Sequence, residues 1–101
     1  MTTITWEQKL QACQDLAPCT LCMRKPGDWY VESTVEVKDG GALIGTYGNG
    51  ATPEQAVHDH WDKMTNLGFM NYRVVNAGRE NRRAVRWNGF MWQDVIEEKQ
   101  L

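Results

Sequence analysis

The sequence lacks several features that mark whole classes of protein. It contains no apolar run near the roughly 20 residues that a membrane helix needs, and no charged segment followed by an apolar stretch at its start. We therefore expect neither a membrane span nor a secretory signal. The formal net charge of −2 has the wrong sign for a protein that coats nucleic acid through bulk charge. Together these absences predict a cytoplasmic protein.

Cysteine is also scarce, and its three copies are an odd number, which does not suggest a disulfide framework. In the cytosol the thiols would stay reduced. Cys13, Cys19, Cys22 and His60 could instead supply thiolate and imidazole ligands to a tetrahedral zinc ion. The spacing fits poorly, because His58 and His60 point about 200° apart on a helix. We expect no cofactor, with Cys13 in the core and the other two cysteines in a loop; a zinc-stabilised domain is an alternative.

The composition that is present suits one small globular domain. The chain has 101 residues, of which 42% are hydrophobic and 24% charged. We expect a single domain over residues 1–101, with frayed ends at 1–4 and 97–101. Five tryptophans are many for this length, and they can serve a core or a binding face.

Two segments have the pattern of amphipathic helices. Thr5 and Gln8 fit a capping box, an apolar residue then recurs on one helical face, and Pro18 stops the pattern. This predicts a helix over 5–17. Thr52-Pro53-Glu54-Gln55 is a second start signal, and Leu67-Gly68 marks the end of that helix. Its predicted buried stripe is Val57, Trp61 and Met64, with Ala56 and His60 beside it.

The remaining segments have the alternation of strands. Residues 29–37 and 42–47 predict a hairpin around a turn at 38–41, preceded by a connector over 18–28. Gly48-Asn49-Gly50 is expected to break the second strand. Residues 72–76, 82–87 and 90–95 predict three more strands, the last two joined by a type I′ turn at Asn88-Gly89. The predicted fold is α+β, in the order α-β-β-α-β-β-β, with two helices packed on an antiparallel sheet.

Arginine and tryptophan gather in these last three strands and give the best candidate site. Arg82 and Arg86 share strand parity and so one face of the sheet, with Arg73 nearby. Trp87 and Trp92 flank the predicted turn. A sheet face with arginine and tryptophan side chains could bind a protein or a phosphate backbone. The alternative is a solvated face paired with carboxylates, with the two tryptophans stabilising the hairpin.

A catalytic site is not expected. His58, Asp59, His60 and Asp62 cluster on the second helix, where a His–Asp pair could do acid–base work. No nucleophile motif accompanies them, and the glycines at 45, 48 and 50 lack the Lys-Ser/Thr of a phosphate-binding loop.

Two resemblances bear on function. The first is carried by Trp29-Tyr30-Val31, residues 37–41, Gly45-Thr46-Tyr47-Gly48 and Thr52-Pro53-Glu54-Gln55-Ala56. Over residues 29–67 this order resembles the strand–strand–helix passage of double-stranded-RNA-binding domains. Those domains carry basic residues at the start of the helix, whereas this helix begins with Pro53-Glu54. The resemblance therefore implies a topology rather than RNA binding.

The second resemblance spans most of the chain. Residues 25–31, 50–57 and 59–61 and the ending Arg86-Trp87-Asn88-Gly89-Phe90-Met91-Trp92 are similar to small uncharacterised proteins of tailed phages and prophages. That family has no established activity and so assigns no site. It implies a small accessory binding protein in the cytoplasm of a host bacterium.

These observations lead to one main expectation and one rival that uses the same surface. We expect a non-enzymatic phage or prophage protein that binds a macromolecular partner, such as a host protein. The predicted partner-binding residues are Arg73, Arg82, Arg86, Trp87 and Trp92. The rival is a nucleic-acid-binding module, whose affinity would fall steeply with salt. The oligomeric state stays open.

Overall fold

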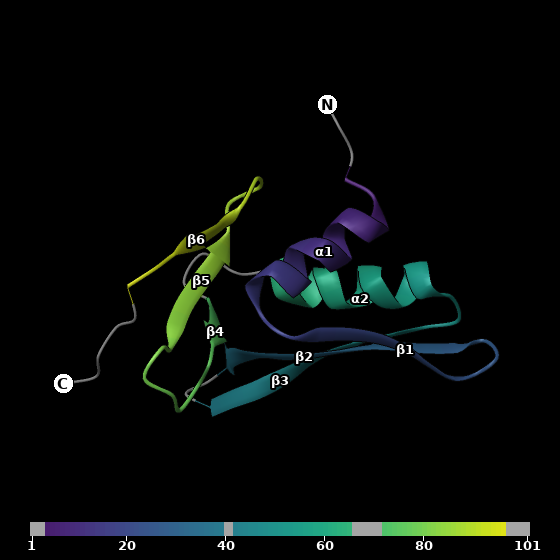
Figure 1. Ribbon diagram of the computed structural model, residues 1–101, viewed down its shortest axis with the longest axis horizontal. Helices are drawn as coiled ribbons and strands as arrows, with labels where there is room; N and C mark the ends of the chain where they lie inside the picture. The colour runs from purple at the N-terminus through teal and green to yellow at the C-terminus, as the bar shows by residue number, and fades with distance from the viewer. Residues whose placement is uncertain (1–3, 40–41, 66–71, 97–101) are drawn as a thin grey trace.

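The computed structural model describes residues 4–39, 42–65 and 72–96 and shows an α+β fold (Figure 1). Its elements are, in chain order, α1 (Trp6–Leu16), β1 (Cys19–Lys25), β2 (Asp28–Asp39), β3 (Ala42–Gly50), α2 (Pro53–Thr65), β4 (Arg73–Val75), β5 (Arg83–Trp87) and β6 (Trp92–Asp94). The predicted class is confirmed, and the sheet has six strands, all paired antiparallel. Neither described helix has the length and apolar character that a membrane span requires.

The additional strand is β1, which lies where we predicted a connector. It pairs with β2 from Cys19↔Ser33 to Lys25↔Asp28, so Pro26 and Gly27 form the turn of a hairpin. Gly27 has a φ of 80°, and proline followed by a positive-φ glycine is the pattern of a type II turn. The prediction was wrong because Pro26 and Gly27 were taken to mark a loop, whereas they reverse the chain and let its flanks pair.

The long strand β2 connects the two parts of the sheet. Val31 and Val35 are fully buried, so their side of the strand faces the core. A bulge interrupts the pairing with β3 between Ser33 and Glu36, and the Val35 N–H donates to Ser33 Oγ at 3.1 Å. Beyond the bulge β2 also pairs with β4, through Glu36↔Val74.

The glycines at 48 and 50 do not break β3, which continues to Gly50. A Cβ on Gly48 would lie 2.3 Å from the carbonyl oxygen of Ala56 and 2.6 Å from the backbone nitrogen of His60. On Gly50 a Cβ would lie 2.6 Å from the Ala56 nitrogen. These glycines therefore let α2 lie closer to the strand backbone than a residue with a Cβ atom would allow.

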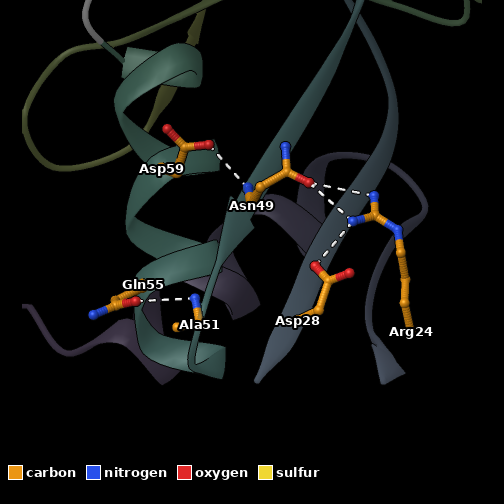
Figure 2. A network of polar contacts seen from close by, with 6 residues as sticks. All are labelled: Arg24, Asp28, Asn49, Ala51, Gln55 and Asp59. Carbon is orange, nitrogen blue, oxygen red and sulfur yellow. Dashed lines mark hydrogen bonds and ion pairs between the residues drawn. The ribbon is translucent and has the colours of Figure 1, made fainter. Parts of the chain in front are cut away.

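Both predicted helices are confirmed, with small changes at their ends. Thr5 and Gln8 form the full capping box of α1. At α2 the Gln55 N–H donates to Thr52 Oγ1 at 3.1 Å, but the Gln55 side chain accepts from the Ala51 N–H (Figure 2) rather than from Thr52. The predicted end at Leu67-Gly68 lies outside the described residues.

The main core lies between the sheet and the two helices, which cover the same face of β1–β3 (Figure 1). All five residues of the predicted α2 stripe are buried. The other buried members of this core are Cys13, Ala17, Cys19, Val31, Val35, Val75 and Val85. A smaller cluster of Tyr72, Val74 and Ala84 lies within the last three strands.

The predicted C-terminal meander is confirmed as β4, β5 and β6, but its last turn differs. Trp87 pairs with Trp92, so the loop spans Asn88 to Met91 rather than two residues. A type I′ turn needs positive φ at both central residues, and among the described non-glycine residues only Asn76 has one. Asn88 Oδ1 instead accepts from the N–H groups of Phe90 and Met91 at 2.9 and 3.0 Å. Asn88 thus acts as a side-chain cap of the loop.

Candidate partner-binding site

Arg73 belongs to the interior, which corrects its assignment to a binding surface. It lies on β4 between β2 and β5, and only 3% of it is exposed. Its Nη2 donates to the carbonyl oxygen of Lys63 in the last turn of α2. Nε and Nη1 have no hydrogen-bond partner in the described part of the chain. Desolvation lowers the pKa of Arg73 to about 10, and the buried side chain cannot contact a partner.

The other two predicted arginines, Arg82 and Arg86, lie just before β5 and on it, and Arg83, which was not part of the predicted site, lies between them. Arg83 forms an ion pair with Asp94 on β6, with Nη2 2.8 Å from Oδ1. Arg82 is exposed and Arg86 is half-buried, and both take part in further interactions within the protein. The basic face is therefore smaller and more neutralised than the count of arginines suggests.

Trp87 and Trp92 are half-buried and pack inward. They pair across β5 and β6, with ring centroids 5.1 Å apart and planes at 66°. Both also contact Trp61 of α2 edge to face, at 4.9 and 6.0 Å. Trp92 Nε1 donates to the Ala12 carbonyl oxygen of α1 at 3.0 Å. Of the two readings of these tryptophans, the geometry favours hairpin stabilisation over an exposed anchor.

The loop between β5 and β6 presents apolar side chains that we did not predict. Phe90 is 90% exposed and Met91 is 61% exposed. Arg86 lies on β5, two residues before this loop begins at Asn88. We call Arg86, Phe90 and Met91 the hairpin-tip surface. The sequence carried a signal for it, since two large apolar residues directly follow the turn residues Asn88-Gly89; the assumed two-residue turn placed them in a strand instead.

The four candidate zinc ligands do not form a common site, although Cys13 lies beside both His60 and Cys19. Cys13 Sγ lies 3.8 Å from His60 Nδ1, and a hydrogen bond with the neighbouring Cys19 thiol, together with burial, holds the pKa of Cys13 well above its usual range. Cys22 is three residues from Cys19 on β1, so the two side chains leave opposite faces of the strand. Among the described residues no group of three or more His, Cys, Asp and Glu could hold a metal ion.

The two histidines of α2 have separate surroundings, so they form no joint site. His60 is buried, and its Nε2 lies 3.3 Å from Thr46 Oγ1. Desolvation, with smaller effects of Lys63 and Arg73, lowers the pKa of His60 to about 4. His58 lies near the surface, with Nδ1 2.9 Å from Lys9 Nζ. His60 is thus a neutral core residue at physiological pH.

A chain of polar contacts ties α2 to the first hairpin (Figure 2). Asp59 Oδ2 accepts from the Asn49 N–H at 2.9 Å and lies 3.1 Å from Lys63 Nζ. These two contacts lower the pKa of Asp59 against the opposing effect of partial burial. Asn49 Oδ1 in turn accepts from Arg24, which forms an ion pair with Asp28 at 3.2 Å. The network is exposed and fixes the end of β3.

A polar cleft of about 450 Å³ lies where the sheet meets the β4–β5 connection. It is lined by Pro18, Thr34, Glu36, Asn76, Ala77, Arg79 and Asn81. Its lining offers neither an imidazole nor a thiol, and it lies apart from the His58–Asp62 cluster. The cleft therefore gives no support to the acid–base chemistry considered for that cluster.

No family model, curated protein or solved structure matches the chain. The likenesses to phage proteins and to RNA-binding domains stay predictions, and the candidate site rests on the residues of this chain.

Proposed function

We propose that this protein is a non-enzymatic binding protein that engages a protein partner through its hairpin-tip surface. The observation that carries the proposal is the exposure of Phe90 and Met91, side by side, on one loop. Large apolar side chains are the usual anchors of protein interfaces, and an adjacent arginine such as Arg86 adds polar contacts at the rim.

The way the loop is held supports this role. Asn88 Oδ1 accepts from the two backbone amides that carry the anchors. Directly behind the loop, Trp92 is fixed to α1 through Ala12. A loop held in this way loses little conformational freedom on binding, which favours affinity. The resemblance to phage accessory proteins fits such a role, with a host protein as the partner.

The rival nucleic-acid function has less support from the geometry. Arg73 is buried in the interior, and the exposed Arg83 is neutralised by its ion pair with Asp94, so the face has less unpaired positive charge than the number of arginines suggests. Phosphate binding depends on such cations. Exposed phenylalanine and methionine at a loop tip suit a protein surface better.

The test compares two surfaces of the same protein. Partners captured from lysate of a bacterial host by the wild type would be measured again with Phe90→Ser/Met91→Ser. We expect a loss of affinity of at least about tenfold, because two apolar anchors are removed. Met23→Ser is the matched control, since Met23 is an exposed methionine on β1, and its affinity should match the wild type. Unchanged binding by the double variant would refute the proposed site.

A further inference from the structure

Strand β3 lies at one side of the sheet. Its inner edge pairs with β2 from Trp29↔Gly50 to Asp39↔Ala42. Among the described strands none pairs with its outer edge. An edge of nine residues offers a row of N–H and C=O groups to any extended chain that can reach it.

The direction of these groups follows from one contact. The Asn49 N–H donates to Asp59 Oδ2 on α2, so it points away from β2. Alternate residues of a strand direct their N–H and C=O groups to the same side, so those of Tyr47, Gly45 and Leu43 point outward too. The bulge between Ser33 and Glu36 adds residues to β2 and leaves the alternation along β3 intact.

Natural sheets protect their edges, and the other edges of this sheet carry such protection. At β1 the Gln14 side chain donates to the Cys19 carbonyl oxygen, and the strand ends in Arg24-Lys25. β6 has only three residues and includes Asp94. Short strands, charges and covering side chains are the usual means of blocking edge pairing.

Among the described residues, those that cover the outer edge of β3 do so near Gly50. There Asp59 occupies the Asn49 N–H, and Lys63 binds the same carboxylate. The segment Ala42-Leu43-Ile44-Gly45-Thr46-Tyr47 contains no charged residue and no proline. Within the part of the chain that the structure describes, the outward backbone positions without such a contact are therefore Leu43, Gly45 and Tyr47, which are arranged evenly about Gly45.

We propose that β3 pairs with β3 of a second copy, antiparallel, across a two-fold axis at Gly45. In this register Gly45 exchanges both hydrogen bonds with its own copy, and Tyr47 does so with Leu43 of the other chain. The uncharged segment brings no like charges together. Tyr47 is 54% exposed, and its Oη lies 3.0 Å from where a Cβ of Gly45 would be, so its ring already covers the strand beside the axis.

The first test separates backbone pairing from side-chain contact. Light scattering behind size exclusion, from low to high micromolar protein, should show a monomer–dimer equilibrium in the wild type. Tyr47→Pro removes an outward N–H and leaves the β2 ladder intact. We expect its dimer dissociation constant to rise about tenfold or more. Tyr47→Ala is the control, because it keeps the N–H while it removes the ring, and it should weaken the dimer less than Tyr47→Pro.

The second test needs no variant and holds even if Tyr47→Pro does not fold. Amide hydrogen exchange should show that protection of Gly45 and Tyr47 rises with protein concentration, whereas Asn49 stays protected throughout through Asp59. A wild type that stays monomeric at all concentrations overturns the proposal and leaves the edge to another protein's strand. A dimer in which Gly45 and Tyr47 stay unprotected overturns it equally. The hairpin-tip surface is elsewhere, so Phe90→Ser should not change this equilibrium.

Discussion

The two parts of the sheet are joined to the helices in different ways. β3 meets α2 through its backbone at Gly48 and Gly50. At either position an added Cβ atom would lie less than 3 Å from atoms of α2. β5 and β6 meet the helices through side chains, since Trp87 and Trp92 contact Trp61 and Trp92 reaches α1. Figure 1 shows β5 and β6 at one end of the helix layer, while β1–β3 lie beneath it.

This difference predicts where the fold tolerates substitutions. A backbone contact has no rotamer that can move away, so an added atom must displace the helix. A cluster of indole rings can shift in small steps and shares its contacts among several residues. We therefore expect substitutions where β3 meets α2 to lower the free energy of unfolding sharply. Substitutions in the tryptophan cluster should lower it by smaller amounts.

The largest effect is expected for Gly48→Ala. The new Cβ would meet the Ala56 carbonyl oxygen at 2.3 Å and the His60 backbone nitrogen at 2.6 Å. Because neither atom belongs to a flexible side chain, α2 must move, at a cost of about 4 kcal/mol in the free energy of unfolding. Urea unfolding followed by circular dichroism would measure it.

Gly45→Ala is the matched control on the same strand. There the Cβ would meet only Tyr47, 3.0 Å from the end of a flexible side chain, so the ring can swing aside. We expect a loss below about 1 kcal/mol. Equal losses at the two positions would show that close approach of α2 is not what distinguishes the first part of the sheet.

A second, smaller effect depends on pH and arises at His60, on the buried face of α2. Burial lowers the pKa of His60 from 6.5 to about 4. Between these values the unfolded chain binds a proton that the folded chain does not, so stability is complete above pH 6.5 and falls as the pH drops toward 4. The full difference is worth about 3 kcal/mol. Urea unfolding at pH 7 and at pH 4.5 would show most of it.

Two glutamine variants isolate the histidine responsible. Carboxylates also titrate toward acid pH, so the informative quantity is the difference between wild type and variant. His60→Gln should lose most of the change in stability between the two pH values, whatever its stability at pH 7. His58→Gln is the control for the change of residue type, because His58 is the other histidine of α2 and is only half-buried, beside Lys9 and Glu54. If His60→Gln kept the pH dependence of the wild type, the change in stability could not be assigned to His60.

Local signals predicted much of this architecture. Thr5 and Thr52 marked both helix starts, and the period of Val57, Trp61 and Met64 marked the buried face of α2. Such signals depend on a few neighbouring residues and survive in the folded chain. The signals that failed were glycines and prolines. Pro26-Gly27 formed a turn inside a hairpin, and Gly48 formed a contact with a helix that the sequence could not place beside it.

The site was harder to predict than the fold for the same reason. Parity along a strand places Arg73 on a face, but it does not say what covers that face. α2 and the flanking strands cover Arg73, and Trp61 turns Trp87 and Trp92 inward. These are tertiary contacts between distant segments. Exposure of Phe90 and Met91 depended on whether the loop had two residues or four, which the pairing of Trp87 with Trp92 decides.

A smaller effect than that of Gly48→Ala or of His60 is expected at the aromatic contact, for Trp92→Phe. The variant loses the hydrogen bond from Nε1 to the Ala12 carbonyl oxygen and part of the ring that meets Trp61. The remaining ring can shift toward Trp87, so the loss should be about 1.5 kcal/mol. The midpoint of urea unfolding, read by circular dichroism, would report it.

Trp87→Phe is the appropriate comparison, because it removes the same area from the neighbouring ring without removing the bond to α1. We expect Trp92→Phe to be the more destabilising of the two, by the contribution of one hydrogen bond. If Trp92→Phe were as costly as Gly48→Ala, the tryptophan cluster would be as intolerant as the glycine contact. The two parts of the sheet would then not differ in how they are attached to the helices.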